Sequence, residues 1–94
     1  MITTALGATA LLLLATSAKA AIIGVVPLQS GAMLRLHDEP RICVNGALLV
    51  EYAMPGKPTI SGCWVRRGDA IHAAFLDGDA GEIPVQAIKR PESI

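Results

Sequence analysis

The chain has 94 residues, of which 52% are hydrophobic, and its eight basic residues balance its eight acidic ones. This length allows one domain at most. The near-neutral composition argues against nucleic-acid binding, because that function needs clustered Lys and Arg side chains that displace counterions from phosphates.

The hydrophobic residues concentrate at the start of the chain. Residues 5–18 carry no charge and include a run of four leucines, and Ala18 and Ala20 follow with the small-residue spacing that signal peptidase recognises. We therefore predict a signal peptide over 1–20 and one small domain over 21–94. An uncleaved membrane anchor is the alternative, because the uncharged stretch approaches the length of a spanning helix and no Lys or Arg precedes it.

The domain begins with two segments that have strand character. Residues 21–29 are apolar and rich in β-branched side chains, which predicts a first strand or an extended lead-in. The Ser-Gly pair at 30–31 predicts a turn. Residues 32–37 alternate, with the leucines on one face, and this period of two predicts a half-buried strand.

A hairpin is predicted in the middle of the chain. Residues 42–44 read as a brief extended piece before the Asn-Gly dipeptide at 45–46, which is a strong turn signal. Residues 47–54 and 59–66 both alternate and are separated by a loop of Pro and Gly. Two such runs around a short loop are typical of a β-hairpin.

The last third of the domain continues the pattern. Residues 70–76 predict a strand, the Asp-Gly turn at 77–78 follows, and residues 82–85 predict a short edge strand because Pro84 cannot donate a ladder hydrogen bond. Residues 86–90 could form one helical turn. The fold class we predict is mainly β, an antiparallel β-meander of four to six strands.

The two cysteines, Cys43 and Cys63, predict one disulfide. An even cysteine count in a small exported chain indicates a bridge. Two free buried thiols are the alternative. Redox pairs are usually two residues apart, and structural metal sites need further ligands at short spacing, so the separation of 20 residues disfavours both. A disulfide also predicts a periplasmic or secreted location.

Acidic residues near the end of the domain resemble part of a calcium loop. Asp77, Asp79 and Glu82 have suitable oxygens, but the loop lacks the acidic residue required at its twelfth position. A hairpin turn explains the same residues. A turn equally explains the adhesion-like tripeptide Arg-Gly-Asp at 67–69. We therefore expect no metal and no cofactor.

His37 is followed by Asp38 and Glu39, which could act as a base with its orienting carboxylate. A catalytic triad would also need a nucleophile, and neither Ser30 nor Ser61 lies in a nucleophile turn such as Gly-x-Ser-x-Gly. We interpret this cluster as a solvated strand end and predict that the protein is not an enzyme.

Trp64, the only tryptophan, directly follows the second cysteine and leaves two interpretations open. It packs in the core against the disulfide, as in other small β domains. Alternatively, it lies on the exposed sheet face as a binding anchor beside Arg66 and Arg67. These three residues are the candidate partner-binding residues.

The order Cys43, then Gly-Cys-Trp at 62–64, then Asp-Gly at 77–78, then Ile-Pro at 83–84 resembles a group of small, uncharacterised exported proteins of proteobacteria and their phages. The resemblance covers residues 36–89. It implies export and a disulfide-bonded β domain, and it implies no active-site residue.

These observations favour a non-enzymatic exported binding module that acts on a protein or a cell-envelope component. A stapled meander presents an edge strand and a flat face, and both suit partner binding. One alternative is a membrane-tethered envelope accessory or structural protein that contacts the membrane only if residues 1–20 are retained. A small hydrolase around His37 is the other.

Overall fold

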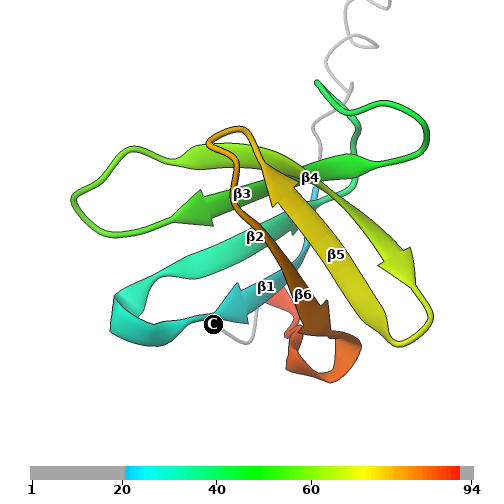
Figure 1. Ribbon diagram of the computed structural model, residues 1–94. Coiled ribbons are helices and arrows are strands. Elements are labelled where there is room, and N and C mark those ends of the chain that lie inside the picture. The colour runs from blue at the N-terminus through cyan, green and yellow to red at the C-terminus, as the bar shows by residue number, and fades with distance from the viewer. Residues whose placement is uncertain (1–20, 92–94) are drawn as a thin grey trace, which may run out of the picture.

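The computed structural model describes residues 21–91. The predicted signal peptide at 1–20 lies outside the described residues. The described part forms one antiparallel sheet of six strands with two short 3₁₀ helices (Figure 1). The mainly β prediction is therefore confirmed, with a strand number at the top of the expected range.

The strands follow one another in the sheet in the order of the sequence, β1-β2-β3-β4-β5-β6. Each pairs antiparallel with its neighbours, as a meander requires. The elements are β1 (Ile22–Pro27), η1 (Gln29–Gly31), β2 (Met33–His37), β3 (Leu48–Ala53), β4 (Ile60–Arg67), β5 (Ala70–Phe75), β6 (Ala80–Pro84) and η2 (Val85–Ala87).

One face of the curled sheet forms the inner face and carries the core. Leu34 and Leu36 of β2 are 4% and 2% exposed, whereas the other three residues of the strand are half-buried. This confirms the predicted alternation. The same alternation places Ile71 of β5 inside. The six core residues are Val26, Leu34, Leu36, Val50, Ile71 and Ala73.

The segment 42–44 does not form the predicted extended piece, and that prediction is wrong. Two turns occupy this region instead, since the Cys43 N–H donates to the Pro40 carbonyl at 2.6 Å and the Ala47 N–H donates to the Val44 carbonyl at 3.1 Å. Arg41 has φ of 45°, which also bends the chain. The disulfide holds this loop against the sheet, so the segment needs no strand partner.

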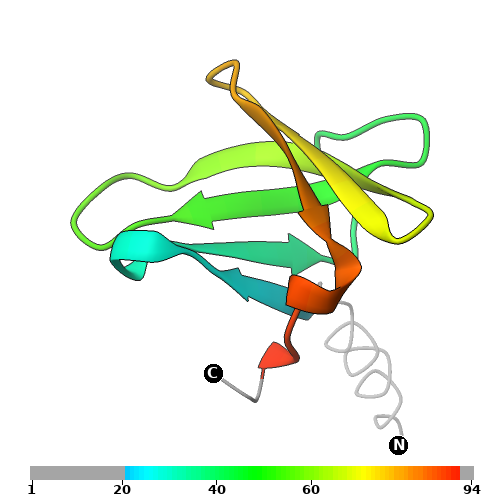
Figure 2. The ribbon, with the colours of Figure 1, turned by 60° about the horizontal axis from the view of Figure 1, so that its bottom comes forward.

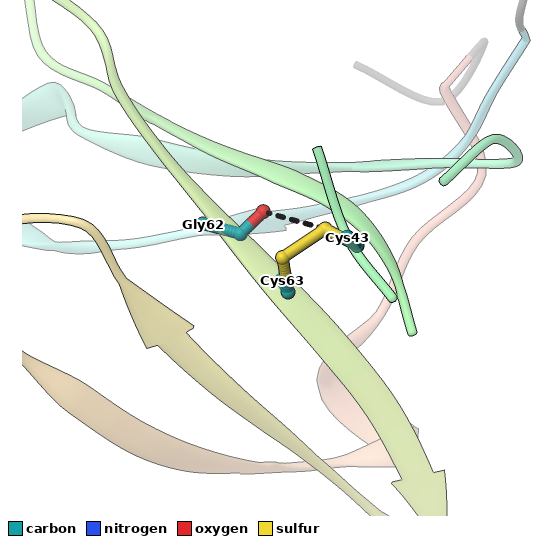
Figure 3. Close-up of a disulfide and its surroundings, with 3 residues drawn as sticks. All are labelled: Cys43, Gly62 and Cys63. Carbon is teal, nitrogen blue, oxygen red and sulfur yellow. Dashed lines mark hydrogen bonds between the residues drawn. A yellow bond between two sulfur atoms is a disulfide. The ribbon is translucent and has the colours of Figure 1, made fainter. Parts of the chain in front are cut away.

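The predicted disulfide joins Cys43 to Cys63 (Figure 3), with Cα atoms 5.7 Å apart. Cys63 is the cross-strand partner of Leu49, and Leu49 is only 4% exposed although it faces away from the core. The contact of 3.6 Å between Cys43 Sγ and the Gly62 carbonyl, dashed in Figure 3, has no hydrogen to share because the sulfur is oxidised. The bridge thus fixes a loop over the outer face of β3 and β4.

The C-terminal segment closes part of the sheet. The predicted helical turn over 86–90 is present as η2, but it begins one residue earlier and ends at Ala87. Lys89 then pairs with Val25 of β1 through two backbone hydrogen bonds of 2.8 and 2.9 Å. Ile88 packs against the core, and a Cβ added at Gly24 would lie 2.6 Å from its Cγ2. Figure 2 shows this segment returning from β6 towards β1.

Candidate functional site

A groove of about 470 Å³ opens beside β6 at the end of the sheet that the C-terminal segment does not close. Leu28, which follows β1, and residues 80–83 of β6 both line it. The groove therefore lies between the two terminal strands of the curled sheet. Its volume is in the range of sites that bind small ligands or apolar side chains.

Inner-face side chains form the floor of the groove. Tyr52 and Phe75 meet edge to face, with ring centroids 6.4 Å apart and an interplanar angle of 81°. Leu34, Ile60 and Ile83 complete the apolar lining. Edge-to-face aromatic packing holds both rings in place, so the floor is preformed.

Gly81 leaves the groove hollow at the centre of β6. It pairs with Ala73, a core residue, so position 81 belongs to the inner face. A Cβ built at Gly81 meets no atom within 4 Å, and its backbone φ is not in the left-handed region. A glycine in a strand interior marks a place where another group can approach the backbone closely.

The rim of the groove is acidic. Asp77, Asp79 and Glu82 are the acidic residues among those that line it, and no basic residue does so. The Asp79 N–H donates to Asp77 Oδ1 at 3.0 Å, which fixes the turn before β6. Glu82 is 62% exposed and lies 3.6 Å from His72 Nε2. An apolar floor below an acidic rim is complementary to a ligand that is apolar and positively charged.

The backbone of β6 pairs with β5 through every second residue. The Val85 N–H donates to the Asp69 carbonyl at 2.8 Å, and Ile83 and Gly81 follow in the same phase of the antiparallel register. Antiparallel pairs alternate between hydrogen-bonded and non-hydrogen-bonded residues. The backbone groups of Gly81 and Ile83 are therefore engaged by β5.

The residues between them direct their backbone groups away from β5. These are Ala80, Glu82 and Pro84, and within residues 21–91 no strand pairs with β6 on that side. Pro84 has no N–H, which fits its outward position. The free edge thus offers the N–H groups of Ala80 and Glu82 and the carbonyls of all three residues.

The interpretation of this cluster as a solvated strand end holds for Asp38 but is wrong for His37, whose side chain is only 13% exposed. His37 Nε2 lies 2.8 Å from Glu51 Oε1, and Arg35 Nε lies 3.3 Å from the same oxygen. Asp38 is exposed, and Glu39 forms an ion pair with Arg41 at 2.6 Å. The neighbours in sequence are therefore not the partners, because β2 pairs with β3 and brings Glu51 alongside.

Electrostatics favour the charged form of Glu51. Burial raises its pKa, but the hydrogen bond with His37 and the positive charges of His37 and Arg35 outweigh burial, so the pKa of Glu51 lies below its ordinary value of 4.5. Ser61 is the cross-strand neighbour of Glu51, yet no hydrogen bond joins Ser61 to His37 in the described part of the chain. The arrangement ties two strands together and lacks the nucleophile contact of a triad.

The three candidate partner-binding residues lie away from the groove. Trp64 packs against the core, and its buried indole N–H has no hydrogen-bond partner among residues 21–91. Arg66 donates from Nε to the Gly68 carbonyl at 2.7 Å and so caps the turn after β4, and Arg67 is exposed. Successive residues of a strand point to opposite faces, so Arg67 lies on the face opposite Trp64 and Arg66, and the three do not form one surface patch.

Over residues 21–91 no group of three or more His, Cys, Asp or Glu side chains could hold a metal ion. In that same range, no helix has the length and apolar character needed to cross a membrane.

Sequence reasoning missed the groove itself. It identified the turn around Asp77 and the edge position of Pro84, but it treated them as local features. The remaining signal was Gly81, which directly precedes the predicted edge strand at 82–85 and lies inside β6, where a glycine indicates close backbone approach.

Comparison with known protein families, curated proteins and solved structures finds no match for this chain.

Proposed function

We propose that this chain is a non-enzymatic, exported protein-binding module, and that the groove between β1 and β6 is its binding site. The observation that carries the proposal is the combination of a preformed apolar groove with an unpaired sheet edge beside it. Soluble domains usually cover such edges. An exposed sheet edge is a recurring site of partner binding, because a strand of the partner can pair with it.

The disulfide supports the exported part of the proposal. Bridges of this kind persist in the periplasm and outside the cell, and they are rare in the reducing cytosol. The resemblance to small exported proteins of proteobacteria and their phages points to the same location. A disulfide also adds stability that a domain of this size needs, because its core cluster of six buried residues is small.

The partner class we favour is a protein. The groove lies beside an unpaired strand edge, and its lining includes three acidic residues. An enzyme would need a nucleophile or base aimed into the groove, and the His37–Glu51 pair faces away from it on the outer side of β2 and β3.

Site-specific photo-crosslinking in the cells that express the protein tests this function. A photoreactive residue at Leu28, which is 38% exposed at the groove, is expected to give a discrete covalent adduct with a second protein. The same residue at Val44, which is 69% exposed on the disulfide loop, serves as the control and is expected to give none.

A second substitution makes the test specific for the groove. A Cβ at position 81 meets no atom within 4 Å, so Gly81→Leu directs its side chain into the hollow over β6 and is expected to abolish the Leu28 adduct. Adducts of equal yield from Leu28 and Val44, or a Leu28 adduct that survives Gly81→Leu, would contradict a binding site in this groove.

A further inference from the structure

We infer that the partner binds as an added β-strand on the free edge of β6, and that the segment it contributes alternates apolar and basic residues. This inference rests on the proposed function and adds to it the conformation and the charge of the ligand.

The spacing of backbone groups on β6 determines the conformation. Ala80 and Glu82 direct N–H and carbonyl groups outwards at every second residue, and this is the pattern that an incoming antiparallel or parallel strand pairs with. The groove continues the inner face beyond that edge, towards Leu28. A strand placed there would cover the gap that the closing segment at Lys89 leaves open.

The apolar floor determines every second side chain of the ligand. Residues of an added strand alternate between the two faces of the sheet. Those on the inner face would enter the hollow above Gly81 and contact Phe75 and Ile83. They must therefore be apolar, because the floor offers no partner for a buried charge.

The carboxylates determine the remaining side chains. Glu82 lies on the outer face, opposite His72, so the ligand residue beside it projects on that face as well. Asp77 and Asp79 stand at the turn where the groove begins. Opposite charges on adjacent strands stabilise a pair and like charges oppose it, so the outer-face residues of the ligand are Lys or Arg.

The same charges argue against a second copy of this chain as the occupant. The sequence of β6 is Ala-Gly-Glu-Ile-Pro and contains no basic residue. Pairing of two β6 edges would bring the Glu82 carboxylates of both copies together, along with Asp77 and Asp79 of the preceding turn. Edge charges and prolines are known devices against self-association, and here they leave a basic partner acceptable.

Nuclear magnetic resonance with defined peptides tests the inference. The probe is a capped synthetic peptide of alternating valine and lysine, about six residues long, the usual length of a strand. Added to the ¹⁵N-labelled full chain with its disulfide intact, it is expected to shift the amide signals of Ala80 and Glu82 most. The matched peptide of valine and glutamate is expected to leave them unchanged.

Two modified peptides separate strand pairing from simple apolar contact, and they leave the protein unaltered. Methylation of the peptide nitrogens that face β6 is expected to abolish binding, whereas methylation of the alternate nitrogens is not.

Substitutions in the protein provide a second test of the edge. Ala80→Pro removes one outward N–H, a group that Pro84 already lacks in the native chain, and it is expected to abolish binding of the lysine peptide. Glu82→Gln is expected to lower the affinity for the lysine peptide by about two- to fivefold, because it removes the negative charge beside the lysines.

Each outcome has a defined meaning. Binding that tolerates both methylation patterns would overturn strand addition while leaving the groove as a binding site. Equal binding of the lysine and glutamate peptides, binding of neither, or dimerisation of the free protein through β6 would overturn the inference. The Leu28 crosslink decides the proposed function separately in every case.

Discussion

Glu51 illustrates how one residue connects two strands on the outer face of the sheet. Its carboxylate accepts contacts from both Arg35 and His37 of β2, while its side chain is only 26% exposed. Partial burial strengthens these contacts relative to a fully exposed ion pair. The cluster therefore contributes to the pairing of β2 with β3 and gives the stability of the fold a dependence on pH.

Replacement of Glu51 by glutamine tests this role. The pKa of Glu51 is lowered in the folded state, so its charged form stabilises the fold above the ordinary pKa of 4.5, and this contribution is lost as the pH falls through the folded value. We expect Glu51→Gln to reduce the free energy of unfolding by about 1 kcal/mol at neutral pH. In urea titrations the difference from the native protein should shrink once the pH is taken below the folded-state pKa.

The control for this substitution is Glu82→Gln, which removes a carboxylate that is 62% exposed. It should leave the urea midpoint almost unchanged at both pH values. A Glu51→Gln effect that is constant with pH would contradict the electrostatic explanation.

Two strand glycines on the inner face form a second matched pair. A Cβ at Gly62 would collide with the Ala74 carbonyl oxygen and lie 2.8 Å from the Phe75 Cα, whereas a Cβ at Gly81 would meet open space. We expect Gly62→Ala to destabilise the fold by about 3 kcal/mol or more, because backbone must move. Gly81→Ala should stabilise it by about 0.5–1 kcal/mol by restricting the unfolded chain. Urea denaturation of both variants measures this, and equal effects would refute the open space at Gly81.

At the scale of elements, the loop between β2 and β3 is attached to the sheet by the disulfide. Cys43 is 6% exposed inside it, while Ile42 and Val44 on either side are 55% and 69% exposed. The loop thus presents one buried sulfur to the sheet and two apolar side chains to solvent. Leu49, the cross-strand partner of Cys63 on the outer face, is itself only 4% exposed.

Removal of the bridge tests its contribution. Closure of a loop across a separation of 20 residues predicts a loss of about 3 kcal/mol on replacing both cysteines by alanine. The reduced native protein should unfold at the same urea midpoint as this double variant. The strand pairing of β4 with β5 is independent of the loop, so its amides should stay protected from hydrogen exchange under native conditions. An unchanged midpoint would show that the loop is held without the disulfide.

At the scale of the whole molecule, local signals made most of the fold predictable. Alternation marked β2 and β5 in the sequence, and the Asn-Gly pair at 45–46 and the Asp-Gly pair at 77–78 marked turns. These signals depend on neighbours within a few residues. The meander order follows from them, because consecutive strands joined by short loops pair with each other.

Contacts between distant residues could not be predicted in the same way. The pairing of Val25 with Lys89 joins the two ends of the domain, and no local pattern at Lys89 indicates a strand partner. The link between His37 and Glu51 depends on strand register, which sequence neighbours do not reveal. The groove exists only because the sheet curls and closes on one side, so local sequence patterns could not predict it either.

The open edge of β6 is the feature on which the binding-module account depends most, and amide hydrogen exchange of the free protein measures it residue by residue. The account predicts rapid exchange at Ala80 and Glu82, whose N–H groups point away from β5, and slow exchange at Gly81 and Ile83, which bond to it. Slow exchange at all four amides would mean that the edge is already covered and would contradict the account.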